Sequence, residues 1–137
     1  MPSADLTLEQ LQAWGENFGA ALVPATVVLL SGELGAGKTT LVQAICRGYG
    51  VTEPVTSPTF ALLHQYAAPK SQVKHFDLYR LESPVELVQL GWQDEIGGRA
   101  VSLVEWPERA DGELPTSSLG LLLEHLASSP ERRRLTW

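Results

Sequence analysis

Eight consecutive residues, Gly32-Glu33-Leu34-Gly35-Ala36-Gly37-Lys38-Thr39, have the types and the spacing of a phosphate-binding loop. Its glycines let backbone N–H groups approach phosphate oxygens without an intervening β-carbon. The Lys38 ammonium would reach the β- and γ-phosphates, and the Thr39 hydroxyl would ligate Mg²⁺. The motif therefore predicts a nucleotide site, whose phosphate-contacting residues we expect to be Glu33, Leu34, Gly35, Ala36, Gly37, Lys38, Thr39 and Thr40.

Hydrolysis at such a loop needs a second metal ligand, and Glu105 is the first candidate. Residues 101–105 read Val-Ser-Leu-Val-Glu, an apolar strand pattern that ends in an acid. This is the Walker B arrangement, with glutamate in place of the more usual aspartate. The alternative is an ordinary solvated glutamate at the end of a strand.

Asp77 is the second candidate carboxylate, in the segment His75-Phe76-Asp77-Leu78-Tyr79-Arg80. On a strand, His75, Asp77 and Tyr79 would share one face. An acid inside an otherwise apolar strand needs a reason, because burying an unpaired charge is costly. Asp77 is therefore either the group that positions water or links to the metal, or one half of an ion pair with Arg80.

A further candidate lies in Ser57-Pro58-Thr59-Phe60, which follows the helix after the phosphate loop. In P-loop switches a sensor of the γ-phosphate occupies this place, which makes Thr59 a candidate contact. The same four residues are equally compatible with simple turn chemistry.

The phosphate loop must be positioned by the elements on either side of it. Residues 26–30 form a continuously apolar run, typical of a strand buried on both faces. Residues 39–49 carry a helical pattern that ends before Gly50. A helix that begins with a capping box of Thr7 and Gln10 precedes both, and its packed face is predicted to comprise Leu8, Leu11, Gly15, Phe18 and Leu22.

The remaining pattern completes an α/β chain. We expect strands over residues 59–66, 73–81 and 100–105, and a helix from a Ser83 cap to about Leu90. Residues 107–117 are predicted to be a loop, and residues 118–126 and 132–137 a terminal antiparallel hairpin. The prediction is a P-loop NTPase-like three-layer α/β fold, with a parallel core sheet and antiparallel additions, forming one domain over residues 1–137.

Composition limits the partners and the compartment. The 137 residues are 44% hydrophobic and 19% charged, which is typical of a globular chain, and carry a formal net charge of -6. An acidic surface argues against salt-driven binding to nucleic acid, although a basic partner could mediate such binding. The single cysteine, Cys46, excludes an internal disulfide and is expected in the core. Without a signal peptide or an apolar run near the roughly 20 residues of a membrane helix, we expect a cytoplasmic protein with no membrane contact.

Four segments in this order resemble the bacterial TsaE (YjeE) family. They are the Gly-Glu-Leu-Gly-Ala-Gly-Lys-Thr-Thr loop, Ser57-Pro58-Thr59-Phe60, His75-Phe76-Asp77-Leu78-Tyr79-Arg80-Leu81 and Leu103-Val104-Glu105-Trp106-Pro107. The resemblance spans about residues 7 to 108. It implies a P-loop ATPase of the tRNA threonylcarbamoyladenosine pathway, with ATP and Mg²⁺ as ligands.

The resemblance also implies partners and roles. The family joins the TsaD and TsaB proteins in a machine that transfers threonylcarbamoyl to adenosine 37 of tRNA, so tRNA would be reached only indirectly. The resemblance implies that ATP hydrolysis by the family member lets that machine turn over. Residue by residue, the likeness implies phosphate and Mg²⁺ contacts for Lys38 and Thr39, Mg²⁺ ligation by Glu105 and an essential carboxylate at Asp77. It places Thr59 in a switch-like loop, Trp106 near the nucleotide and Glu108 at the ribose or base.

Three other functions are alternatives to an ATPase. A translational GTPase is excluded, because its Asn-Lys-x-Asp loop needs an asparagine and Asn17 in the first helix is the only one. Asp94-Glu95-Ile96-Gly97 matches a GTPase motif but follows no clear strand, so we expect a helix or turn there. A small kinase would need an arginine-bearing lid, and a nucleotide-gated adaptor would not need hydrolysis. These last two alternatives remain open.

Overall fold

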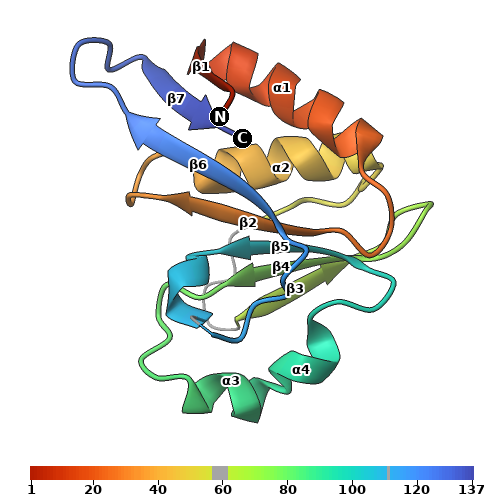
Figure 1. The fold of residues 1–137 in the computed structure, drawn as a ribbon. Coiled ribbons are helices and arrows are strands. Elements are labelled where there is room, and N and C mark those ends of the chain that lie inside the picture. Colours follow the sequence, from red (N-terminus) through yellow and green to blue (C-terminus); the bar gives the residue numbers. More distant parts are fainter. Residues whose placement is uncertain (57–61, 111) are drawn as a thin grey trace.

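The computed structural model describes residues 1–56, 62–110 and 112–137, which form a seven-stranded sheet flanked by helices. Figure 1 shows α1 and α2 on one face of the sheet and α3 and α4 on the other. The helices are α1 (Leu8–Ala21), α2 (Lys38–Tyr49), α3 (Val85–Leu90), α4 (Trp92–Glu95) and the 3-10 turn η1 (Pro107–Ala110). The strands are β1 (Ser3–Thr7), β2 (Val27–Gly32), β3 (Leu63–Tyr66), β4 (Val73–Asp77), β5 (Val101–Glu105), β6 (Leu119–His125) and β7 (Arg132–Thr136).

The sheet has the order β1-β7-β6-β2-β5-β4-β3, with a parallel centre and antiparallel margins. β2 pairs in parallel with both β5 and β6, and β5 pairs in parallel with β4. β3 is antiparallel to β4, β7 to β6 and β1 to β7. The predicted parallel core with antiparallel additions is therefore confirmed.

The core lies on both faces of the sheet, as the unbroken apolar run of β2 predicts. Val28 and Leu30 point towards α1 and α2, whereas Val27 and Leu29 point towards α3 and α4. Cys46 is fully buried on the α2 side, where burial raises the pKa of its thiol to about 12. The three-layer prediction and the core position of Cys46 are both confirmed.

The register of the parallel strands brings the functional segments to one edge. Glu105 pairs with Leu30 of β2 on one side and with Asp77 of β4 on the other. The carboxyl ends of parallel strands meet at one edge of a sheet, which is where open α/β sheets bind ligands. The ends of β2, β4 and β5 therefore lie together at this edge, although 28 to 73 positions separate their last residues along the chain.

Several predicted boundaries were wrong. The strand predicted over 73–81 ends at Asp77, because the Leu78 N–H donates to the Glu105 carbonyl at 3.1 Å and the Tyr79 N–H turns back to the Asp77 carboxylate at 3.0 Å. Tyr79 thus does not share a strand face with Asp77. Leu8 was predicted to lie on the packed face of the first helix, but it is the first residue of α1 and is 58% exposed.

Local capping was predicted correctly at one helix and incorrectly at another. Thr7 and Gln10 form the reciprocal capping box at the start of α1. At α3 the residue before the helix is Pro84, and no side chain caps it, so the predicted Ser83 cap is wrong. Residues 92–95 are helical, as expected for the Asp94 motif. Strand β1, at the edge of the sheet, was not predicted.

Helix α2, which begins at the phosphate loop, is held against α1 by backbone-to-backbone packing. A β-carbon on Gly48 would lie 2.0 Å from the Glu16 carbonyl oxygen, and one on Gly19 would lie 2.1 Å from that of Ile45. A real β-carbon does not approach a carbonyl oxygen so closely, so only glycine fits at these two positions. The two glycines therefore set how closely α2 approaches α1, and through it where the loop sits.

Gly48→Ala is expected to lower the free energy of unfolding by about 1–3 kcal/mol, the usual cost of overpacking. Alanine stabilises a helix by about 1 kcal/mol relative to glycine. The measured loss of unfolding free energy is therefore the overpacking cost minus this gain. Chemical denaturation measures it. Gly120→Ala is the control, because nothing lies within 4 Å of a β-carbon there. Equal stability of the two variants would contradict close packing of α1 on α2.

Candidate functional site

The turn between β2 and α2 has the geometry of an anion cradle. Gly35 and Gly37 adopt positive φ angles of 79° and 103°, which glycine accepts without strain. A β-carbon on Gly32 would lie 2.5 Å from the Leu123 carbonyl oxygen, so β6 also requires glycine there. No side chain caps the start of α2, and the first N–H groups of a helix that lacks such a cap can donate to an anion.

Lys38 lies folded across this turn and only 5% of it is exposed. Its ammonium donates to the Gly32 carbonyl and to the Glu33 carbonyl, the latter at 3.0 Å. Burial lowers the pKa of Lys38, while the carboxylates of Glu105, Glu108 and Asp77 act in the opposite direction. The ammonium is therefore held beside three acids by neutral carbonyls, which a phosphate could replace as acceptors.

Thr39 and Glu105 meet beside the ammonium. The Thr39 hydroxyl donates to Glu105 Oε1 at 3.4 Å, and Glu105 is 3% exposed. A hydroxyl and a carboxylate are hard oxygen ligands, which suit Mg²⁺ completed by phosphate oxygens and water. Across the described residues there is no group of three or more His, Cys, Asp or Glu side chains that could hold a metal ion.

Asp77 lies on the neighbouring strand, opposite Glu105 in the β4–β5 register. Its carboxylate accepts the Tyr79 N–H at 3.0 Å and acts on the pKa of Lys38. The structure thus brings the two predicted acids and the predicted lysine to one place, at the edge of the sheet where the phosphate loop ends.

Trp106 covers the lysine with its indole ring. The Lys38 ammonium lies 4.0 Å from the ring centroid, and Tyr79 packs against the same ring at 5.0 Å between centroids. Trp106 has a φ angle of 58°, which is uncommon for a bulky residue and marks strain of the kind that clusters at functional sites. This backbone twist at the end of β5 turns the ring over Lys38.

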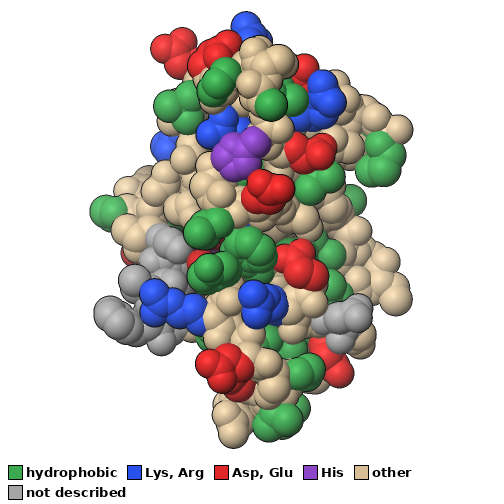
Figure 2. Space-filling view, turned by 90° about the vertical axis from the view of Figure 1, so that its left-hand side faces the viewer, with side chains coloured by type: hydrophobic (Ala, Val, Ile, Leu, Met, Phe, Trp, Pro, Cys, Tyr) green, Lys and Arg blue, Asp and Glu red, His purple; other side chains and the backbone are tan. Residues whose placement is uncertain are grey.

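The remaining predicted residues lie around this centre. Glu33, Leu34 and Gly35 form an exposed loop tip, and Ala36 is buried beneath it. Thr40 is half-buried in the first turn of α2, and Glu108 is exposed in η1. Thr59 lies outside the described residues. Figure 2 looks onto the edge of the sheet at which these strands end, where hydrophobic side chains gather with acidic and basic ones around them.

Two features of the structure were not predicted from the sequence. His75 Nε2 lies 2.5 Å from Glu105 Oε2, a contact between neighbouring strands that only the register reveals. Between β7 and β1, Arg134 forms an ion pair with Asp5 at 2.8 Å, and the guanidinium lowers the pKa of Asp5.

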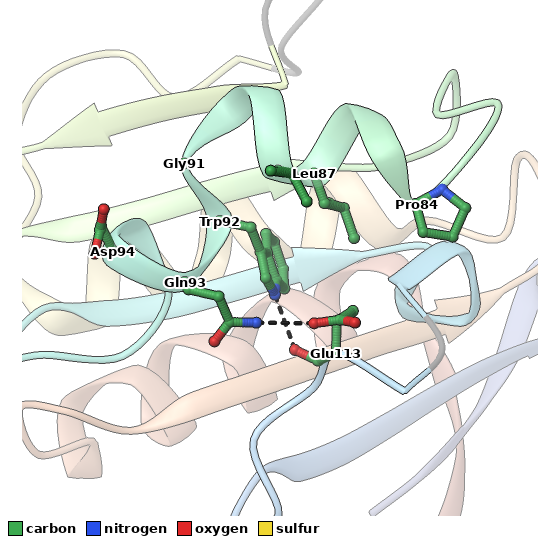
Figure 3. Close-up of a pocket in the computed structure, with 8 residues that line it drawn as sticks. Pro84, Leu87, Gly91, Trp92, Gln93, Asp94 and Glu113 are labelled. Atoms are coloured by element: carbon green, nitrogen blue, oxygen red, sulfur yellow. Dashed lines mark hydrogen bonds between the residues drawn. The ribbon is translucent and has the colours of Figure 1, made fainter.

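A hollow of about 230 Å³ lies beside α3 and α4, and none of the predicted site residues lines it. Figure 3 shows Trp92 and Gln93 directed at Glu113, whose carbonyl accepts from the indole at 2.9 Å and whose carboxylate accepts from the Gln93 amide at 2.9 Å. These bonds tie α4 to the segment after η1.

The glycine turn, the buried lysine and the threonine–glutamate pair at the carboxyl edge of a parallel sheet define the protein as a P-loop nucleotide-binding fold. The sequence model of one family, "Threonylcarbamoyl adenosine biosynthesis protein TsaE", matches residues 6–135. The chain belongs to the TsaE family.

Individual relatives and a solved structure agree with this assignment. A TsaE protein of Treponema pallidum is 40% identical over 114 residues, covering 83% of this chain and 84% of its own length. One of Synechocystis is 42% identical over 105 residues, covering 74% and 67%. The crystal structure of Bacillus subtilis YdiB superposes with a TM-score of 0.80 at 26% identity, over 98% of this chain and 83% of that one. Among the described residues no helix is long and apolar enough to cross a membrane.

Proposed function

We propose that this chain binds and hydrolyses ATP with Mg²⁺ as a component of the machinery that makes N6-threonylcarbamoyladenosine in tRNA. The proposal rests on one observation above all: Thr39 and Glu105 are side by side, within the reach of Lys38. The relatives' names, which assign them to threonylcarbamoyladenosine biosynthesis, supply the pathway.

Each residue at the edge has a role in this proposal. The N–H groups of residues 33–40 and the Lys38 ammonium bind the β- and γ-phosphates. Thr39 and Glu105 hold Mg²⁺, which neutralises charge on those phosphates. Asp77, opposite Glu105, orients the attacking water. Trp106, Glu108 and Thr59 complete the nucleotide site.

The partners in this proposal are TsaD and TsaB, with tRNA engaged only through them. A net charge of -6 supports indirect engagement, since an acidic surface repels a phosphate backbone. On this account the chain works in the cytoplasm, as one P-loop domain over residues 1–137, and hydrolysis releases or resets the partner complex.

The purified chain is expected to hydrolyse ATP slowly. An arginine delivered to the γ-phosphate is worth about 10³–10⁵ in rate in related P-loop enzymes. Here Arg109 donates to the Leu81 carbonyl at 3.2 Å and Arg134 is paired with Asp5. Phosphate release by the chain alone, compared with release after addition of TsaD and TsaB, measures the difference. Fast turnover in isolation would contradict the proposed dependence on partners.

Reconstitution tests the proposal as a whole. The chain is mixed with TsaB, TsaD and the carbamoyl-adenylate donor system, and modified tRNA is counted over many turnovers. Multiple turnover should require Lys38. Transfer of phosphate to a small acceptor in place of water would instead favour a kinase. Normal turnover with a Glu105→Ala variant that no longer hydrolyses ATP would favour an adaptor.

A further inference from the structure

His75 is a fully buried polar side chain in the middle of β4, with 0% of its surface exposed. Its Nε2 atom lies 2.5 Å from Glu105 Oε2. Its Nδ1 atom is also buried and has no hydrogen-bond partner within residues 1–56, 62–110 and 112–137. Nε2 therefore hydrogen-bonds to Glu105, whereas Nδ1 has no hydrogen-bond partner among the described residues.

The contact has a direction. A carboxylate only accepts hydrogen bonds, so Nε2–H is the donor and Glu105 Oε2 the acceptor. With the proton on Nε2, Nδ1 carries a lone pair, so the ring has no N–H group without a hydrogen-bond partner. Full burial of the ring thus fits a histidine that has a single hydrogen-bond partner.

The two oxygens of Glu105 consequently have different neighbours. Oε2 is held by His75, whereas Oε1 faces the Thr39 hydroxyl at 3.4 Å. Because His75 pairs in register with Leu103, two residues before Glu105, the imidazole reaches diagonally across the two strands. A short side chain at this position would not span that diagonal.

We propose that His75 is a positioning residue, which fixes the Glu105 carboxylate so that Oε1 is directed at the metal beside Thr39. The inference rests on the proposed function, since it concerns the same metal site. Partners of metal-binding carboxylates orient their ligands in this way, and their loss typically costs about 10–100-fold in metal affinity or activity.

The test compares His75→Asn with His75→Gln. The amide nitrogen of glutamine lies near the place of Nε2 and can still donate to Glu105, whereas that of asparagine lies near Nδ1 and cannot. ATP affinity is measured by titration calorimetry with Mg²⁺ and again with EDTA. We expect His75→Asn to lose about 10-fold or more of the affinity with Mg²⁺ and little in EDTA. His75→Gln should restore most of the loss.

The possible results distinguish a positioning role of His75 from a packing role, and also test the proposed metal site. If both variants weaken binding equally with and without Mg²⁺, His75 is only a packing residue and the inference is wrong. If the wild type gains affinity from Mg²⁺ and His75→Asn gains as much, the inference fails while the proposed function stands. If the wild type gains nothing from Mg²⁺, both are wrong.

A measurement on the wild-type chain does not depend on how the variants fold. Long-range ¹H–¹⁵N NMR spectra report which ring nitrogen of His75 carries the proton. The proton is expected on Nε2, both in the free protein and with Mg²⁺ and ATP bound. A ring without a proton on Nε2 in either state would overturn the proposed orientation of Glu105, because Nε2 could then not donate to Oε2.

Discussion

Glu105→Gln is expected to lower ATP hydrolysis by about 10²–10³-fold while the protein remains folded, as for the loss of one electrostatic group from a catalytic site. Glutamine keeps the shape of the side chain but is a much weaker ligand for Mg²⁺. Its carbonyl can accept from His75 Nε2, and its amide can donate to the Thr39 hydroxyl. The unfolding free energy should change by no more than about 1 kcal/mol, because each hydrogen bond has a replacement.

Steady-state phosphate release and thermal unfolding, on the same samples, check this expectation. Glu16→Gln is the matched control, because it removes the same charge from an exposed site. Glu16 in α1 forms an ion pair with Arg47 in α2, with 3.0 Å between Oε1 and Nε. Such a pair contributes about 0–1 kcal/mol, and hydrolysis should be unaffected. If Glu105→Gln hydrolysed ATP at the wild-type rate, Glu105 would not be a ligand of the catalytic metal.

Lys38→Met is expected to weaken ATP binding by about 10–100-fold, since a hydrogen bond to a charged group contributes about 1.5–3 kcal/mol. Methionine retains most of the apolar stem under Trp106 but removes the ammonium that lies 4.0 Å from the ring centroid. AMP lacks the β- and γ-phosphates, so its affinity should change little. The comparison of ATP with AMP therefore isolates the phosphate contact from any change in the loop.

Lys70→Met is the matched control for Lys38→Met. Lys70 donates to the Leu22 carbonyl at 3.1 Å, just past the end of α1, and also lies near Tyr49. Its replacement removes the same charge at a place that should not alter either affinity. If Lys38→Met weakened ATP and AMP equally, Lys38 would support the loop and would not contact the outer phosphates.

Much of the fold could be predicted because its signals are local. The capping box of α1, the apolar run of β2 and Gly50 at the end of α2 each occupy a few neighbouring residues, and their conformations follow from those residues alone. The terminal hairpin was predicted for similar reasons. β1 was missed because five residues with mixed exposure become a strand only when β7 offers its edge.

The candidate site was also predicted where its signals are local and missed where they depend on which strands are neighbours. Strand β4 was predicted four residues too long, because its apolar pattern continues past the point at which Leu78 bonds to Glu105 and the chain turns. His75 was assigned to the correct strand, but its partner lies 30 residues away. No local pattern reports which strands are neighbours.

The sequence by itself determined the phosphate loop, since eight contiguous residues carry both the backbone freedom and the charge that a phosphate requires. It also determined that Glu105 ends one strand-like segment and that Asp77 lies within another. Only the tertiary structure decided that Thr39 Oγ1 lies 3.4 Å from Glu105 Oε1 across 66 residues, that His75 holds the other oxygen, and that Trp106 turns over Lys38. The physical reason is the register of β2, β4 and β5, which depends on packing of the whole sheet and on no single segment.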